Sequence, residues 1–190
     1  MQNDPQLRYR ISPRRLVVMT SLSAGQYLWY WFYLTWKQYR DHTGERAYPF
    51  WHVGAVGVPI YGIFPVHAHV TALNAMISRG GVPVRIAPGW VVLAFAIFYD
   101  LNLALLPFGL QEITKAFAAI LLLVSALTVA VSLALLLSVQ RELNTYWDSL
   151  ADTSVQRAGL GVGETILAVV GALMWLSLVW VLLGLSETTG

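Results

Sequence analysis

The feature that most constrains this chain is a long apolar run. Residues 116–139, AFAAILLLVSALTVAVSLALLLSV, contain no charged residue, no glycine and no proline. Because a helix needs about 20 apolar residues to cross the hydrocarbon core of a bilayer, this run predicts a transmembrane helix. Four more apolar stretches of spanning length occur at residues 16–36, 50–73, 90–107 and 165–185. The sequence therefore predicts an all-α fold, a polytopic transmembrane helical bundle of about five spans.

The composition indicates that lipid is the solvent for much of the chain. Hydrophobic residues make up 57% of it and charged residues 12%, about half of the roughly 25% charge that is typical of soluble domains. A soluble core cannot hide this much apolar surface, so lipid must cover part of it. The chain has no cysteine, which excludes disulfides and thiolate metal sites. Its basic residues are spread over every loop, so the net charge of +2 does not indicate nucleic acid as a partner.

A single transmembrane domain is expected over residues 16–185. It is flanked by a cytoplasmic N-terminal tail at 1–15 and a C-terminal tail at 186–190. Within the domain, apolar residues at 140–150 recur at helical spacing. This segment predicts either a continuation of the fourth helix past the membrane or a helix that lies on the membrane surface.

The second stretch, residues 50–73, differs from the others. It contains Pro59, Pro65 and three glycines. Proline interrupts a helix, and irregular backbone at membrane depth needs protein around it. This stretch is therefore expected to be a kinked span or a re-entrant helix packed inside protein.

The distribution of Lys and Arg predicts the orientation in the membrane. With five spans, eight of these residues fall on the side of the N-terminus and four on the other side. If the second stretch does not cross, the counts become five and seven. Because cytoplasmic loops carry an excess of Lys and Arg, the counts favour five spans in the inner (cytoplasmic) membrane, with the N-terminus in the cytoplasm.

Three polar residues within the predicted spans are candidates for function. Gln26 lies at the midpoint of the first span and Asp100 near the middle of the third, with Asn102 two residues further on. A polar group alone in hydrocarbon is costly, and an intramembrane carboxylate is a functional candidate. One expectation is a hydrogen bond between Gln26 and Asp100 at similar depth. The alternative is a shifted third helix, in which Asp100 reaches an interface.

Seven of the ten residues at positions 27–36 are aromatic. An aromatic belt at the membrane interface accounts for the later ones. Tyr27, however, falls near the bilayer centre, where its hydroxyl needs a partner. Tyr27, Tyr30 and Trp31 are therefore expected either to pack within the bundle or to face another helix, a pigment or a quinone-like ring.

His67 and His69 form a His-X-His pair in the second stretch. On a helix, residues two apart point about 200° away from each other, so one helix cannot present both to a single metal. Either one is able to bind a haem or chlorophyll-type metal axially, and the simpler interpretation is that neighbouring helices satisfy both. The sequence requires no metal and no cofactor.

The stretch PRRLVVMTSLSAGQYLWYWFYLTWKQYR, followed by a Pro-Phe pair, carries a Tyr-X-X-Tyr-Trp-X-Tyr-X-X-Trp pattern at 27–36. In these residues the chain resembles a bacterial family of small multi-spanning membrane proteins that form a domain of unknown function. The resemblance implies a polytopic membrane fold and carries no activity with it. A second signature, Gln-Arg-X-X-Asn, marks Gln140, Arg141 and Asn144 as one helical face near the cytoplasmic surface, where they would brace the loops or meet a partner protein.

The sequence leaves three functions open. It contains no HExxH, Walker A or GxSxG motif, so no catalytic site is indicated. The expected function is that of a non-catalytic accessory or scaffold subunit of a larger bacterial membrane complex, whose partners are the lipid bilayer and other membrane subunits. The alternatives are a small oligomeric transporter or channel that uses Asp100 and Gln26, and a membrane subunit that binds haem, chlorophyll or quinone.

Overall fold

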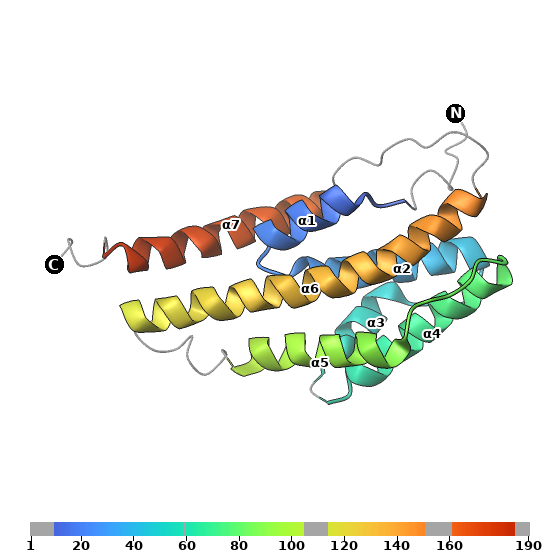
Figure 1. Ribbon diagram of the computed structural model, residues 1–190, viewed down its shortest axis with the longest axis horizontal. Coiled ribbons are helices and arrows are strands. Elements are labelled where there is room, and N and C mark those ends of the chain that lie inside the picture. The colour runs from blue at the N-terminus through green and yellow to red at the C-terminus, as the bar shows by residue number, and fades with distance from the viewer. Residues whose placement is uncertain (1–9, 59, 105–113, 151–160, 185–190) are drawn as a thin grey trace.

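The computed structural model describes residues 10–58, 60–104, 114–150 and 161–184, with only the backbone described at 100–104. Within these ranges the chain forms seven α-helices and no strand (Figure 1). The helices are α1 (Pro13–Leu22), α2 (Tyr27–Thr43), α3 (Pro49–Val56), α4 (Ile63–Arg79), α5 (Pro88–Ala104), α6 (Lys115–Leu150) and α7 (Val162–Leu182). The predicted all-α class is therefore confirmed for the described part of the chain.

Helix α6 runs the length of the bundle (Figure 1). Its 36 residues extend over about 54 Å at 1.5 Å per residue. The apolar run at 116–139 and the amphipathic segment at 140–150 belong to this one helix, so the segment continues the helix and buries Leu143, Tyr146 and Trp147. Within the described ranges, α6 and α7 are the two helices long and apolar enough to cross a membrane.

Residues 16–36 form two helices where one spanning helix was expected. The chain turns back at residues 23–26, where Ala24 and Gly25 have φ angles of 50° and 88°. The Gly25 N–H donates to the carbonyl of Thr20 at 2.8 Å, a glycine-type helix end that satisfies a terminal carbonyl. We call α1, α2 and this turn the first hairpin.

Contacts with α6 establish this reversal. The turn lies against the middle of α6, so closely that a Cβ atom added to Gly25 would lie 2.7 Å from the methyl group of Thr128. Ile11, just ahead of α1, bonds through its backbone to Asn144 near the C-terminal end of α6. The last turn of α2 bonds to the Tyr146 hydroxyl at the same end of α6. Both helices of the first hairpin therefore lie along the C-terminal half of α6.

The second predicted span also contains two helices, α3 and α4, around a turn at 57–62. Gly62 allows the turn to close, because a Cβ atom there would lie 2.1 Å from the carbonyl oxygen of Val56. The Tyr99 hydroxyl of α5 donates to the carbonyl of Gly57 at 3.0 Å and fixes the tip. A kinked span or a re-entrant helix was expected here, and the structure shows two helices with a reversal of the chain between them. We call α3, α4 and this turn the second hairpin.

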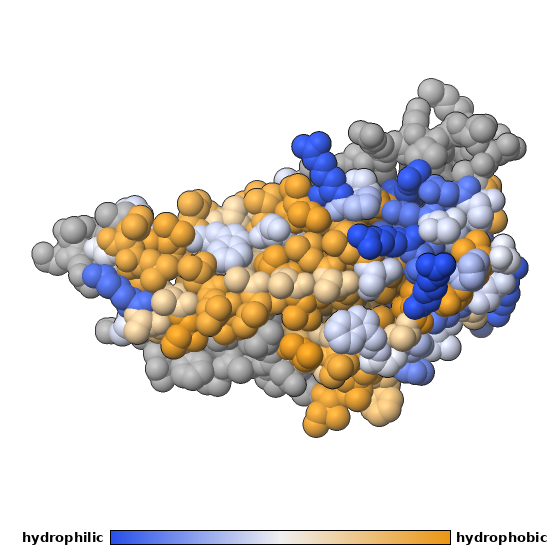
Figure 2. Space-filling model, in the orientation of Figure 1, coloured by the Kyte–Doolittle hydropathy of each residue, from blue (hydrophilic) through white to orange (hydrophobic). Residues whose placement is uncertain are grey.

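One end of the bundle is hydrophilic and the rest of the visible surface is largely apolar (Figure 2). This polar end holds the first turns of α1, α3, α5 and α7 and the last turns of α2, α4 and α6. Of the ten Lys and Arg residues in the described ranges, nine lie in or near it: Arg10, Arg14, Arg15, Lys37, Arg40, Arg46, Arg79, Arg85 and Arg141.

The five-span prediction placed Lys37, Arg40 and Arg46 on the side opposite to the N-terminus. In the structure they share the polar end with Arg10, and Lys115 is the described basic residue at the other end. The difference has one cause: the first two apolar stretches each turn back partway along α6, so the loops that follow them return to the starting end.

Candidate functional site

A buried ion pair joins the first hairpin to α7. Glu164 lies in the first turn of α7, and its side chain is 0% exposed. Its carboxylate accepts hydrogen bonds from Nε and Nη2 of Arg15, with 2.9 Å between Nε and Oε1. The Tyr27 hydroxyl donates to Oε1 at 2.7 Å, and the Gly161 N–H donates to Oε2 at 2.8 Å. Donors from α1, from α2 and from the start of α7 thus converge on one carboxylate.

Of the residues in this cluster, the sequence pointed only to Tyr27, because its hydroxyl needs a hydrogen-bond partner. Arg15 and Glu164 were not among the candidates, although each stands at the edge of an apolar run. They are 149 residues apart in the chain, and no local pattern connects them. Their pairing depends on the reversal of the first hairpin, which brings α1 and α2 to the start of α7.

A second polar network ties the first hairpin to α6. The Trp31 indole donates to Gln140 Oε1 at 2.7 Å, and Gln140 Nε2 donates to Asn144 Oδ1 at 3.0 Å. Asn144 Nδ2 in turn donates to the Ile11 carbonyl at 2.8 Å. Gln140 and Asn144 are buried, whereas Arg141 is exposed. Two of the three residues of the Gln-Arg-X-X-Asn signature therefore brace the interior, and the third faces outward.

The two histidines of the His-X-His pair point in different directions. His69 is fully buried, and its Nε2 lies 2.9 Å from the Thr35 hydroxyl of α2, whereas His67 is exposed. The ring of Trp36 packs between His69 and His52, with a centroid distance of 4.2 Å to the stacked His52 ring. Among the described residues, no group of three or more His, Cys, Asp or Glu side chains is placed to hold a metal ion.

The structure places Gln26 and the pair Asp100 and Asn102 in different parts of the fold. Gln26 lies in the turn of the first hairpin, not at the middle of a helix, and its Oε1 accepts from the Trp29 indole at 3.2 Å. Asp100 and Asn102 lie in the last part of α5, and their side chains fall outside the described residues. The Gln26–Asp100 hydrogen bond stays a prediction.

The polar end has its own charge cluster around Glu45, in the loop between the hairpins. The Tyr39 hydroxyl donates to Glu45 Oε2, and Arg79 Nη1 donates to Oε1 at 3.0 Å. The bond from Tyr39 and then the Arg79 guanidinium hold the pKa of the Glu45 carboxyl below its usual value. This cluster links α2 to the end of α4, on the outer surface of the bundle.

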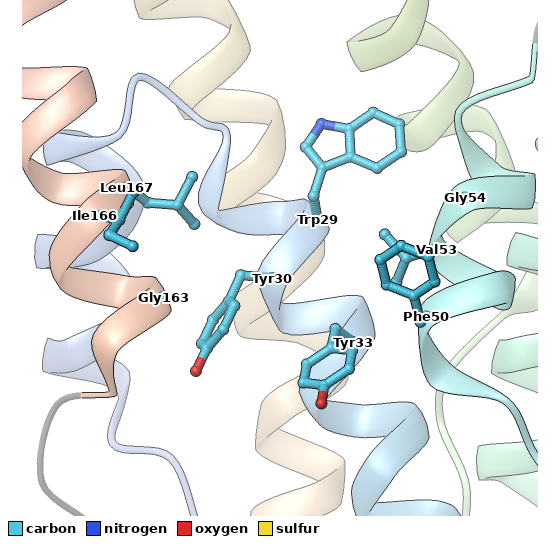
Figure 3. Close-up of a pocket in the computed structure, with 9 residues that line it drawn as sticks. All are labelled: Trp29, Tyr30, Tyr33, Phe50, Val53, Gly54, Gly163, Ile166 and Leu167. Atoms are coloured by element: carbon cyan, nitrogen blue, oxygen red, sulfur yellow. The ribbon is translucent and has the colours of Figure 1, made fainter.

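An apolar groove lies between α3 and α7, with α2 as its floor (Figure 3). Its volume is about 430 Å³, within the range of small-ligand sites. The lining residues are Trp29, Tyr30 and Tyr33 of α2, Phe50, Val53 and Gly54 of α3, and Gly163, Ile166 and Leu167 of α7. Of the predicted ligand contacts, only Tyr30 lines this groove; Tyr27 and Trp31 point into the bundle, toward Glu164 and Gln140.

Glycines shape both walls of the groove. A Cβ atom on Gly163 would lie 2.6 Å from the Tyr30 ring, so glycine here lets the ring lie directly against α7. A Cβ atom on Gly54 would meet nothing within 4 Å, so this wall is open. In Figure 3, the Tyr30 and Tyr33 hydroxyls both point along α2 away from Trp29, which is toward the polar end.

Comparison with protein-family models, with curated proteins and with solved structures gives no match for this chain. The resemblance to a bacterial membrane family of unknown function therefore stays a prediction. Function has to be argued from the ion pair, the polar networks and the groove.

Proposed function

We propose that this chain is an integral protein of the cytoplasmic membrane in which α5, α6 and α7 cross the bilayer. The two hairpins enter from the cytoplasmic side and turn back within it. The apolar length of α6 and α7 supports two of these crossings, as does the outward exposure of Val169, Leu173 and Leu176 along α7. Helix α5 is included because the 17 residues of this apolar helix extend over about 26 Å. In water this surface would be unfavourable, and in lipid it needs no cover.

The charges support a cytoplasmic polar end and N-terminus. In this arrangement nine of the ten described Lys and Arg residues lie on one side of the membrane. Such an excess of basic residues is typical of cytoplasmic loops. The bias is stronger than the eight-to-four distribution over the whole chain that five full spans would give.

This topology makes a direct prediction for labelling. The chain contains no cysteine, so single substitutions report one site each. We expect Arg46→Cys and Arg85→Cys to react with an impermeant maleimide in inside-out vesicles and Lys115→Cys to react in right-side-out vesicles. Reaction of Arg46→Cys on the same side as Lys115→Cys would show instead that the first stretch crosses the membrane.

Within this membrane we infer that the chain acts as a non-catalytic subunit of a larger assembly. The supporting observation is the exposure of the tip of the second hairpin. Val58, Ile60 and Tyr61 at this tip are 48%, 83% and 54% exposed. Irregular backbone is tolerated at membrane depth only where protein covers it or where it lines a water-filled cavity. Apolar side chains do not suit a water-filled cavity, so a second polypeptide is the natural cover.

The depth of this tip follows from its neighbours. A Cβ atom on Gly57 would lie 4.0 Å from the Trp29 ring, and Trp29 stands in the first turn of α2. The adjacent turn of the first hairpin packs on Thr128, near the midpoint of α6. Both tips therefore fall well inside the hydrocarbon region if α6 crosses it.

The assembly is tested by native mass spectrometry after extraction in a mild detergent. We expect the wild-type chain to appear in a complex larger than its own 21.1 kDa. Ile60→Lys should release the free chain, because a charge at the tip cannot be buried against an apolar partner without loss, while Ile60→Leu should retain the complex. A wild-type protein that appears only as the 21.1 kDa chain in mild detergent would contradict the proposal.

A further inference from the structure

The floor of the groove changes character along its length. From the N-cap residue of α2 to residue 40, the side chains that are not buried are Gln26, Trp29, Tyr30, Tyr33, Leu34, Lys37 and Arg40. Apart from Leu34, these positions fall within about 100° of the helix circumference. They form one strip that is aromatic beside α3 and α7 and cationic toward the polar end. We call it the α2 strip.

We propose that the groove binds one acyl chain of an anionic glycerophospholipid, whose phosphate group contacts Lys37 and Arg40 at the polar end of the α2 strip. The proposal concerns the groove between α3 and α7 and does not depend on the partner that covers the second hairpin.

The apolar part of the site fits a lipid tail. The groove is walled by Phe50 and Val53 on one side and Ile166 and Leu167 on the other. It is open to the side between α3 and α7, which is where bilayer lipid would enter it. An aliphatic chain fills such a cavity through dispersion contacts and needs no hydrogen bonds from it.

The polar part of the site fits an anionic head group. Lys37 follows Tyr33 by four residues, which is about 6 Å along the helix, so an acyl chain beside Tyr33 places its ester and phosphate near Lys37. The Lys37 and Arg40 side chains are 45% and 41% exposed, and both pair with the Asp41 carboxylate, Arg40 at 2.8 Å and Lys37 at 4.0 Å. The two cations therefore leave a net positive charge at the mouth of the groove.

The charge of the whole polar end adds to this local effect. Its described side chains include the nine basic residues against five carboxylates, which are Asp41, Glu45, Glu142, Asp148 and Glu164. Basic residues beside the cytoplasmic leaflet attract anionic lipids. The Tyr30 and Tyr33 hydroxyls, which point toward the same end, suit the ester and glycerol level.

Other occupants use only part of this surface. A neutral ring would fill the aromatic part alone and would gain nothing from the net positive charge at Lys37 and Arg40. A transmembrane helix of a partner would have to bury these two cations against an apolar face, which is costly. An amphipathic molecule with a negatively charged head matches both parts in the observed order.

The test is native mass spectrometry of the delipidated full chain, titrated with phosphatidylglycerol and with phosphatidylcholine of identical acyl chains. We expect one retained phosphatidylglycerol and binding about thirtyfold tighter than for phosphatidylcholine, since each Lys or Arg near the surface contributes about fivefold. The double variant Lys37→Gln, Arg40→Gln should lose this preference. Arg141→Gln, an exposed cation outside the α2 strip, is the matched control and should keep it.

Groove-filling variants test the tail site separately. Gly54→Trp should abolish retention of both lipids, because the indole occupies the open wall, while Gly89→Trp, at an equally open position on α5, should not. Far-ultraviolet circular dichroism on each variant confirms that the helices are retained. Equal binding of the two lipids, an equal loss in Arg141→Gln, or loss of a bound polypeptide instead of a lipid in Gly54→Trp would each overturn the proposal. The number of bound lipids is measured on the single chain, so the result of this test does not depend on whether the chain assembles with a partner.

Discussion

Substitution of Glu164 by alanine is expected to lower the free energy of unfolding by about 3 kcal/mol, the lower end of the range for breaking a buried ion pair. The loss is large because the Arg15 guanidinium keeps its desolvation penalty after its carboxylate is removed. It falls at the lower end because the Arg15 side chain retains 17% exposure and can be partly hydrated. Tyr27 also loses the acceptor of its hydroxyl.

The matched control for this prediction is Asp148→Ala. Asp148 pairs with Arg10 at 3.0 Å, but both side chains are nearly half exposed, so its removal should cost less than about 1 kcal/mol. Reversible unfolding in mixed micelles, followed by circular dichroism, measures both values. The double variant Arg15→Met, Glu164→Met should be less damaging than Glu164→Ala, because no buried charge is left alone. Equal losses in Glu164→Ala and Asp148→Ala would show that the ion pair is not buried in the folded protein.

Gly171→Ala is expected to destabilise the protein by about 1–3 kcal/mol, although it adds a single methyl group. The added Cβ atom would lie 2.1 Å from the carbonyl oxygen of Leu22 and 2.4 Å from Cα of Ser23. Both are backbone atoms at the point where α1 enters the turn of the first hairpin, so no side-chain rotation relieves the clash. Either the turn or α7 has to move.

Gly89→Ala is the control for Gly171→Ala, since a Cβ atom on Gly89 meets nothing within 4 Å and alanine is the better helix former. The thermal unfolding midpoint should fall for Gly171→Ala and stay equal or rise for Gly89→Ala. Equal midpoints for the two variants would mean that α7 does not touch the first hairpin. Small residues at such crossings are typical of helices that pack within membranes.

The hydropathy of the sequence predicted the long helices but not where the chain reverses. The run at 116–139 starts within one residue of α6, which continues beyond the run to Leu150, and the run at 165–185 corresponds to α7 within three residues. The break in the second stretch was also foreseeable, because proline and glycine interrupt it. The first hairpin was not, because 16–36 contains no charged residue and no proline, and hydropathy measures the preferred solvent, not the direction of the chain. Its reversal depends on contacts with Thr128 and Gly171, more than 100 residues away.

In the candidate sites, too, local features could be predicted from the sequence, whereas partners distant in the chain could not. The need of the Tyr27 hydroxyl for a partner could be predicted from its depth, but its partner Glu164 could not. Bracing was one of the two roles expected for Gln140, Arg141 and Asn144, and the structure adds the Trp31 indole as the group that bonds to Gln140. The groove combines residues of three helices, and only Tyr30 stood out in the sequence.

The pairing of Arg15 with Glu164 has a consequence for biosynthesis. Ribosomes deliver the chain from its N-terminus at about 5–20 residues per second, so the guanidinium emerges roughly 7–30 s before the carboxylate, which follows it by 149 residues. During that interval the newly made α1 and α2 lack the carboxylate that pairs with Arg15 and accepts from Tyr27. Helix α7, which is made after the other six described helices, thus fixes α1 in place.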